Sequence, residues 1–193
     1  MKKLLAFIFA LSSLAMTHAQ EHLTFKGVPI DGTLDAFVAN MEKAGFKHLG
    51  SEDGVAQLQG DFAGYRNCDV SVATLKSLNI VNCISVSFGI YEKWSDLYEN
   101  YSSLKSMLVK KYGEWSECVE RFDTSYPPKD DGTRMTCLVL DSCKYCVLWV
   151  TDMGTIKLKM SGTNSLHTGG FVVLSYSDKN NTESIQNKAL EDL

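Results

Sequence analysis

Two stretches of this 193-residue chain carry apolar side chains at helical spacing, and strand-like segments follow each of them. The first stretch, Thr33–Ala44, is followed by Gly45, and the second, Ser95–Tyr112, is followed by Gly113. A glycine directly after a periodic run is a typical end of a helix. The sequence therefore predicts two amphipathic helices. Their apolar faces comprise Leu34, Phe37, Val38 and Met41 in the first, and Leu97, Tyr98, Tyr101, Leu104 and Leu108 in the second.

The segments between and after these helices alternate apolar and polar residues, as half-buried strands do. The order of elements predicts an α+β fold in which antiparallel sheet carries both helices on one face. The predicted strands are Val55–Phe62, Cys68–Leu75 and Ile80–Ile90 after the first helix, and Cys118–Phe122, Met135–Leu140, Tyr145–Thr151, Thr155–Met160 and Phe171–Ser177 after the second.

The same order of elements occurs twice, which indicates two α-β-β-β units. Residues 84–88 superpose on residues 172–176, and the two helices superpose at a smaller offset. The difference between the offsets is close to the length of the segment Cys118–Leu140, so we expect an extra hairpin in the second unit. The predicted organisation is a leader at 1–19, a first unit at 20–90, a second unit at 91–177 and a polar, loosely docked tail at 178–193.

The leader has the three parts of a secretory signal peptide. Lys2 and Lys3 precede the apolar run Leu4–Met16, and small residues stand before Gln20. We expect cleavage between Ala19 and Gln20 and a periplasmic or secreted product without a lipid anchor, because no cysteine follows the cleavage site. The formal net charge of −4 becomes more negative without the two lysines. An acidic chain without a basic block is a poor partner for nucleic acid, and no later run could span a membrane.

Cysteines are even in number, and in an exported chain this favours disulfides over metal ligation. If a hairpin turns at Pro127-Pro128, Cys118 lies opposite Cys137, within disulfide reach. The C-x-x-C pair Cys143 and Cys146 runs into a strand rather than a helix, which favours a structural role over redox catalysis. The disulfide candidates are Cys68, Cys83, Cys118, Cys137, Cys143 and Cys146.

Motifs for catalysis and cofactor binding are missing from the sequence. It contains no H-E-x-x-H metal motif, no G-x-S-x-G nucleophile elbow and no glycine-rich phosphate loop of either common type. A pair of catalytic carboxylates, as in a glycosidase, stays an open alternative, because the distance between two carboxylates cannot be read from the sequence. We therefore expect neither an enzyme nor a cofactor.

Two segments carry candidate contact residues. Tyr126 lies beside two prolines at the expected hairpin tip, where burial is hard to arrange. The segment Gly60–Arg66 is a glycine-bracketed turn that could recognise a partner. It could equally be an ordinary strand bend in which Phe62 packs inward and Asp61 pairs with Arg66. The candidate binding residues are Tyr126, Asp61, Tyr65 and Arg66.

A helix that ends in glycine, followed by antiparallel strands and then repeated, resembles the tandem fold of β-lactamase inhibitory protein and of the SmpA-type outer-membrane assembly lipoproteins. The segments Gly27–Leu34 and Trp94–Leu97 also resemble parts of uncharacterised exported proteins of gut-type Gram-negative bacteria. SmpA-type proteins carry a lipid-attached cysteine where this chain has Gln20, so an assembly role is not implied.

The resemblance and the missing motifs together predict a non-catalytic exported protein that binds another protein through an open sheet face. The alternative is a module that binds a glycan or another small molecule. A polar sheet face would favour the protein partner, and an apolar cavity or a trough of exposed aromatic rings would favour the small ligand.

Overall fold

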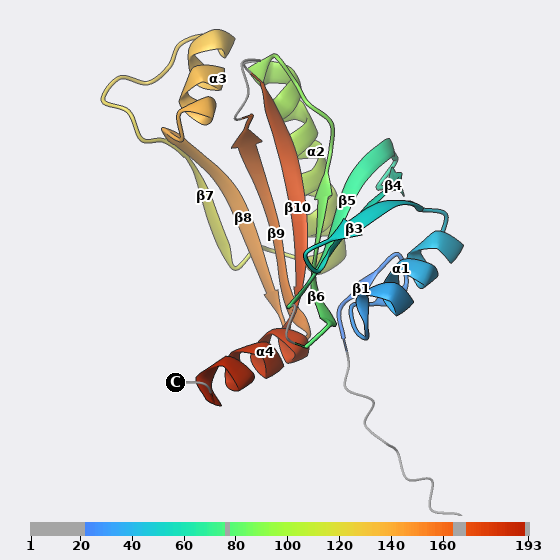
Figure 1. The fold of residues 1–193 in the computed structure, drawn as a ribbon. Helices are drawn as coiled ribbons and strands as arrows, with labels where there is room; N and C mark the ends of the chain where they lie inside the picture. Colours follow the sequence, from blue (N-terminus) through green and yellow to red (C-terminus); the bar gives the residue numbers. More distant parts are fainter. Residues whose placement is uncertain (1–21, 76–77, 164–168, 192–193) are drawn as a thin grey trace, which may run out of the picture.

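The computed structural model describes residues 22–75, 78–163 and 169–191, which form an α+β fold of four helices and an open eight-stranded antiparallel sheet (Figure 1). A two-stranded ribbon, β1 (Thr24–Phe25) and β2 (Val28–Pro29), precedes them. The helices are α1 (Leu34–Lys43), α2 (Trp94–Tyr112), α3 (Asp131–Val139) and α4 (Lys179–Glu191). The strands of the large sheet are β3 (Lys47–Glu52), β4 (Val55–Phe62), β5 (Tyr65–Leu75), β6 (Ile80–Ser87), β7 (Glu117–Phe122), β8 (Cys143–Thr151), β9 (Gly154–Gly162) and β10 (Gly170–Asp178).

The sheet has two halves that meet in its centre. The strand order is β3-β4-β5-β6-β10-β9-β8-β7, so the last strand of each half pairs with the other. At this seam Val86 on β6 lies directly opposite Leu174 on β10. These are two of the residues that the internal sequence comparison superposes. Each half therefore consists of one long helix followed by four strands, with α3 inserted between β7 and β8.

The core lies on one face of this sheet. A row of fully buried side chains crosses six neighbouring strands, and the buried faces of α1 and α2 belong to the same core. Alternation along each strand sends the intervening side chains to the opposite face. The row consists of Leu58, Val70, Val86, Leu174, Leu158 and Val147.

Both predicted helices are confirmed with their ends. The Thr33 hydroxyl accepts a hydrogen bond from the Ala36 amide at 3.4 Å and caps α1. α2 ends at Gly113, whose φ of 81° lies in the left-handed region that glycine adopts without strain. The predicted strand Val55–Phe62 matches β4 at both ends.

The predicted extra hairpin is wrong. The segment expected to form its second strand, Met135–Leu140, belongs to helix α3, and β7 pairs with β8 instead. Asp130 starts this helix with a capping box. Its side chain accepts a hydrogen bond from the Thr133 amide at 2.8 Å, and the Thr133 side chain accepts one from the Asp130 amide. Once the helix begins there, Met135 and Leu138 fall on its buried side.

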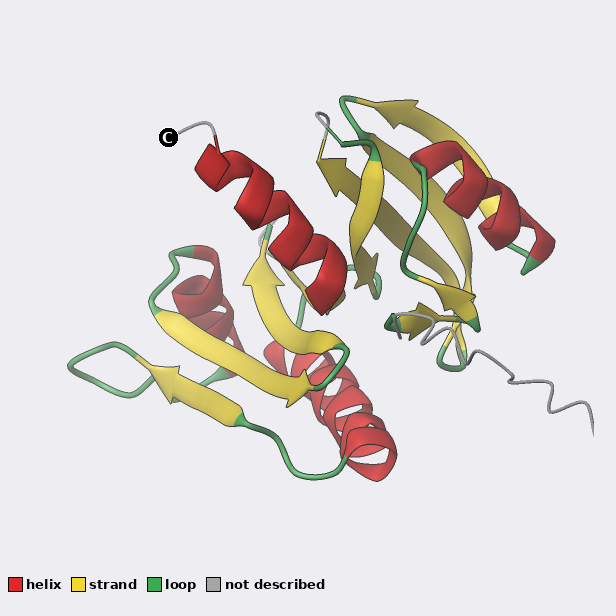
Figure 2. Cartoon of the chain, turned by 90° about the horizontal axis from the view of Figure 1, so that it is seen from below, coloured by secondary structure: helices red, strands yellow, loops and turns green. Residues whose placement is uncertain are grey.

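The C-terminal segment is a docked helix rather than a loose tail. Asp178 is completely buried and accepts hydrogen bonds from the backbone amides of Leu23 and Asn181 at 2.9 and 3.0 Å. The Asn181 amide group in turn donates to the carbonyls of Ile30 and Val81. Figure 2 shows α4 at this end of the molecule, between the two halves of the sheet. The fold therefore joins its first and last described segments.

The predicted leader, 1–19, lies outside the described residues. Among the helices that are described, none is both long and apolar enough to cross a membrane.

Candidate functional site on the open sheet face

The uncovered side of the large sheet, which we call the open face, presents two rows of side chains from six strands. The register of the strands places the members of each row next to one another. The first row is Cys146, Lys159, Val173, Ser87, Asp69 and Gln59, and the second is Leu148, Lys157, Ser175, Ser85, Ser71 and Gln57.

The centre of the open face is polar, short-chained and internally hydrogen-bonded. The hydroxyls of Ser85 and Ser175 lie 2.9 Å apart across the seam between the two halves. Ser71 donates to the Gln57 side-chain oxygen at 2.9 Å. Because such side chains reach only a short way above the sheet, a partner can approach the strands closely here.

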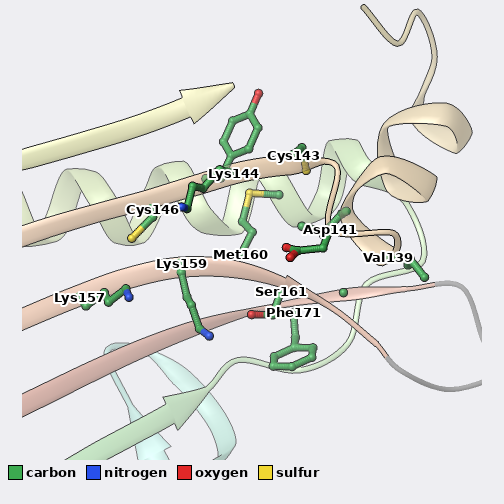
Figure 3. Close-up of a pocket in the computed structure, with 13 residues that line it drawn as sticks. Val139, Asp141, Cys143, Lys144, Cys146, Lys157, Lys159, Met160, Ser161 and Phe171 are labelled. Atoms are coloured by element: carbon green, nitrogen blue, oxygen red, sulfur yellow. The ribbon is translucent and has the colours of Figure 1, made fainter. Parts of the chain in front are cut away.

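Beyond Cys146 and Lys159, where the pairing of β8 with β9 ends, a groove of about 610 Å³ lies between the two strands (Figure 3). Its lining includes residues of the open face and of the covered face. Cys146, Lys159 and Phe171 line it from three neighbouring strands, and Val139 and Asp141 contribute from the end of α3. α3 lies tightly against the sheet at this point. A Cβ atom on Gly162 would come within 2.6 Å of the Val139 Cα atom, so only glycine permits this approach.

Three lysines dominate the charge of the groove. Lys144, Lys157 and Lys159 all line it and are exposed. Within the described ranges none of the three forms an ion pair with a carboxylate. Lys105 on α2 is different, because its ammonium group lies 2.6 Å from the Glu120 carboxylate. The groove lining therefore carries three lysines against one carboxylate, that of Asp141, on an acidic protein.

The cysteines do not form the predicted disulfides. All six are free thiols. Cys118 lies opposite Val147 on β8 and Cys137 sits on α3, so the strand pairing that was expected to join them does not exist. Cys143 and Cys146 lie three residues apart on one strand. Their Cα atoms are then about 10 Å apart, too far for a disulfide.

Burial also makes the C-x-x-C pair a poor redox centre. Burial, followed by the charge of neighbouring Cys137, raises the pKa of the Cys143 thiol to about 12. A reactive cysteine needs the opposite shift, since the thiolate is the nucleophile. Both cysteines line the groove, but Cys143 is buried on the core side of β8, whereas Cys146 lies on the open face.

The predicted contact residues lie in two separate places. Tyr126 is 88% exposed, in the loop between β7 and α3. The other three flank the turn between β4 and β5: Asp61 on β4, and Tyr65 and Arg66 on β5. The Asp61 carboxylate accepts from the backbone amide of Asn67 at 3.1 Å rather than pairing with Arg66.

The rest of this turn packs against the core. Phe62 stacks on Phe25 with ring centroids 4.8 Å apart, and Tyr65 meets the edge of Phe88 at 5.1 Å. These contacts match the strand-bend interpretation more closely than a free recognition loop.

The groove lysines were missed at the sequence level, although a signal for them exists. The sequence predicts a strand over Thr155–Met160, and its alternation sends Lys157 and Lys159 to the side opposite Ile156, Leu158 and Met160. That these two lysines lie near Lys144 follows only from the register of β8 and β9.

The arrangement defines an α+β protein with a covered sheet face and an open polar one. Comparison of the chain with protein-family models, curated proteins and solved structures finds no match in any of the three.

Proposed function

We propose that this chain is an exported, non-catalytic protein that binds another protein through the open face. The observation that carries the proposal is the asymmetry of the sheet. One face is buried under helices, while the other is a broad surface of satisfied polar groups beside a positively charged groove. An antiparallel sheet of this kind can leave one face available for contacts without loss of its core.

The chemistry of the open face favours a protein over a small ligand. Phe171 is the single aromatic side chain at the open-face strand positions of the groove and the two rows. Pockets for small molecules are usually enclosed and mostly apolar. A wide polar surface of short side chains instead suits the rim and hydrogen bonds of a protein interface.

The proposal includes a tandem architecture with both long helices on the covered face. The pairing of Val86 with Leu174 at the seam supports it, since each residue is the other's counterpart in the internal superposition. Joining two similar units through their last strands doubles the width of the open face. The resemblance of the sequence to tandem inhibitory proteins is consistent with this use of the sheet.

A second candidate function, glycan binding, is favoured by a crevice of about 430 Å³ between α2, α3 and β8. Tyr98 is 43% exposed there and lies parallel to the buried ring of Trp94, with Asp131 and Arg134 beside it. An exposed ring flanked by charged groups can stack on a sugar. Loss of oligosaccharide binding in Tyr98→Ala, measured by calorimetry against cell-envelope glycans, would support this alternative.

Site-specific photo-cross-linking tests the protein-binding proposal. A photoreactive amino acid at Ser85, in the centre of the open face, should give a discrete protein adduct in the native periplasm or culture medium. The matched control is Ser106, an exposed residue of α2 on the other side of the sheet. Adducts from Ser106 but not from Ser85, or from neither position, would refute binding through the open face.

A further inference from the structure

We infer that the β8–β9 groove receives an acidic, extended segment of the protein partner, an inference that rests on the proposed function. The groove brings together three exposed lysines, two cysteines and two aromatic rings, and it lies beside the last paired residues of β8 and β9, Cys146 and Lys159. Its charge, its floor and its position each restrict what can occupy it.

Charge is the first restriction. Lys157 and Lys159 are neighbours on one side of β9, so their Cα atoms lie about 7 Å apart. Lys144 stands two residues before Cys146, which is paired with Lys159. Three lysines at neighbouring positions of one groove repel one another, and the described chain supplies no carboxylate in an ion pair with any of them. An occupant with several carboxylates would remove that repulsion.

The floor is the second restriction. On the open-face side, the lining beside the lysines consists of Cys146, Ser161 and the ring of Phe171. The first two side chains are short, which leaves space for a backbone, and the third offers one apolar contact. The period of about 7 Å between the lysines on β9 equals the repeat of side chains on one side of an extended chain. Carboxylates at alternate positions of an extended segment would therefore meet successive lysines.

Two carboxylates limit where the charged part of the segment can lie. Asp141 lies at the α3 end of the groove, and Asp69 lies on the far half of the open face. Both carboxylates would repel an acidic chain. Its charged part is thus confined to the middle of the groove, and the rest of the partner lies over the serines at the seam.

The test uses two fluorescent five-residue peptides that differ only in charge, one with glutamate at positions 1, 3 and 5 and one with glutamine there. Both carry leucine at position 2 and glycine at position 4. Binding to the mature protein is measured by anisotropy at low and high salt, and contacts are mapped by amide NMR shifts. We expect the glutamate peptide to bind at least about tenfold more tightly at low salt and to shift the β8 and β9 amides.

Charge-reversed variants locate the site. Lys157→Glu/Lys159→Glu should weaken binding of the glutamate peptide by about tenfold or more. The matched control is Lys43→Glu/Lys47→Glu, which reverses the same charge at exposed positions near the opposite edge of the sheet. It should stay within about twofold of the wild type. All four positions are exposed, and dispersed NMR spectra of each variant verify that it is folded.

Each outcome decides the inference. Equal binding of the two peptides, no detectable binding, or equal loss in both double variants would overturn it. The Ser85 cross-linking experiment separates this failure from failure of the proposed function. A protein adduct at Ser85 that survives Lys157→Glu/Lys159→Glu would leave the open face as an interface and remove the acidic segment from it.

Discussion

The His22 ring nitrogen lies 3.0 Å from the Asp178 carboxylate, which joins two residues from opposite ends of the described chain. His22 also stands 3.7 Å from Asp31. The same Asp178 carboxylate holds the Leu23 amide and the start of α4. A fully buried carboxylate is costly unless such donors surround it, so this cluster holds the N-terminal ribbon and α4 to the sheet as a unit.

Asp178→Ala should lower the free energy of unfolding by about 2–4 kcal/mol, because it leaves the buried Leu23 and Asn181 amides without their acceptor. Urea denaturation monitored by circular dichroism measures the change. Asp69→Ala is the control, since that carboxylate is exposed and accepts a hydrogen bond from the Gln59 side chain. Equal, small effects of the two substitutions would show that the buried cluster does not stabilise the fold.

Glu120 should make stability depend on pH. Burial alone would raise the pKa of its carboxyl, but hydrogen bonds from Lys105 and Tyr101, at 2.6 and 3.0 Å, outweigh burial and lower it. The folded state therefore binds this proton less tightly than the unfolded state. The resulting stabilisation is complete above the unfolded pKa of about 4.3 and disappears as the pH falls through the lowered folded value.

Glu120→Gln tests this sign. Urea denaturation should show the variant about 1 kcal/mol less stable than the wild type at neutral pH, with a gap that closes in acid. Glu117→Gln, an exposed position on the same strand, should show no such gap. A deficit of Glu120→Gln that is constant from neutral pH to pH 3 would contradict the proposed role of the charge.

Gly162→Ala should destabilise the protein by about 1–3 kcal/mol, because the added methyl group meets the α3 backbone at Val139. Thermal unfolding gives the size of the effect. Gly132→Ala is a suitable comparison, since it lies in the first turn of α3 and its Cβ would come no closer than 3.4 Å to Asp130. That substitution should be neutral or stabilising by up to about 1 kcal/mol. If both variants behave alike, the tight contact of α3 with β9 is not real.

Oxidation should link Cys137 to Cys143 and to no other cysteine. The Ser142 amide donates to the Cys137 carbonyl at 2.7 Å, and the next residue, Cys143, is near enough to Cys137 that, besides burial, the charge of Cys137 raises its pKa. Oxidised glutathione would accept the two electrons and two protons of the thiols. The tryptic peptide Met135–Lys144 contains both cysteines and should become lighter by two hydrogen atoms. A bond from Cys143 to Cys146 would contradict the placement of both residues on one strand.

The sequence predicted the elements whose signals are local. The helical spacing of Phe37 and Met41, and the alternation of Ile84 and Val86, each identify an element without any long-range information. α3 was missed because Asp130 and the following glycine also suit a turn. The cap was nonetheless visible as aspartate three residues before Thr133.

Features that depend on distant parts of the chain were not predictable in this way. α4 looks like a polar tail, and its docking depends on Asn181 contacting Ile30 and Val81, far away in the sequence. The groove depends equally on the register that places Cys146 beside Lys159. Local patterns carry no information about such contacts.

The central seam has a consequence for how the protein is made. β10 follows the other seven strands of the sheet along the chain, yet it occupies the middle of the sheet between β6 and β9. Until it emerges, β6 presents an unpaired edge, and neither half can complete its core. Exposed strand edges invite pairing with other chains, so a partly made chain needs to be kept apart from its neighbours. The two halves therefore become one sheet only when β10 takes its place between β6 and β9.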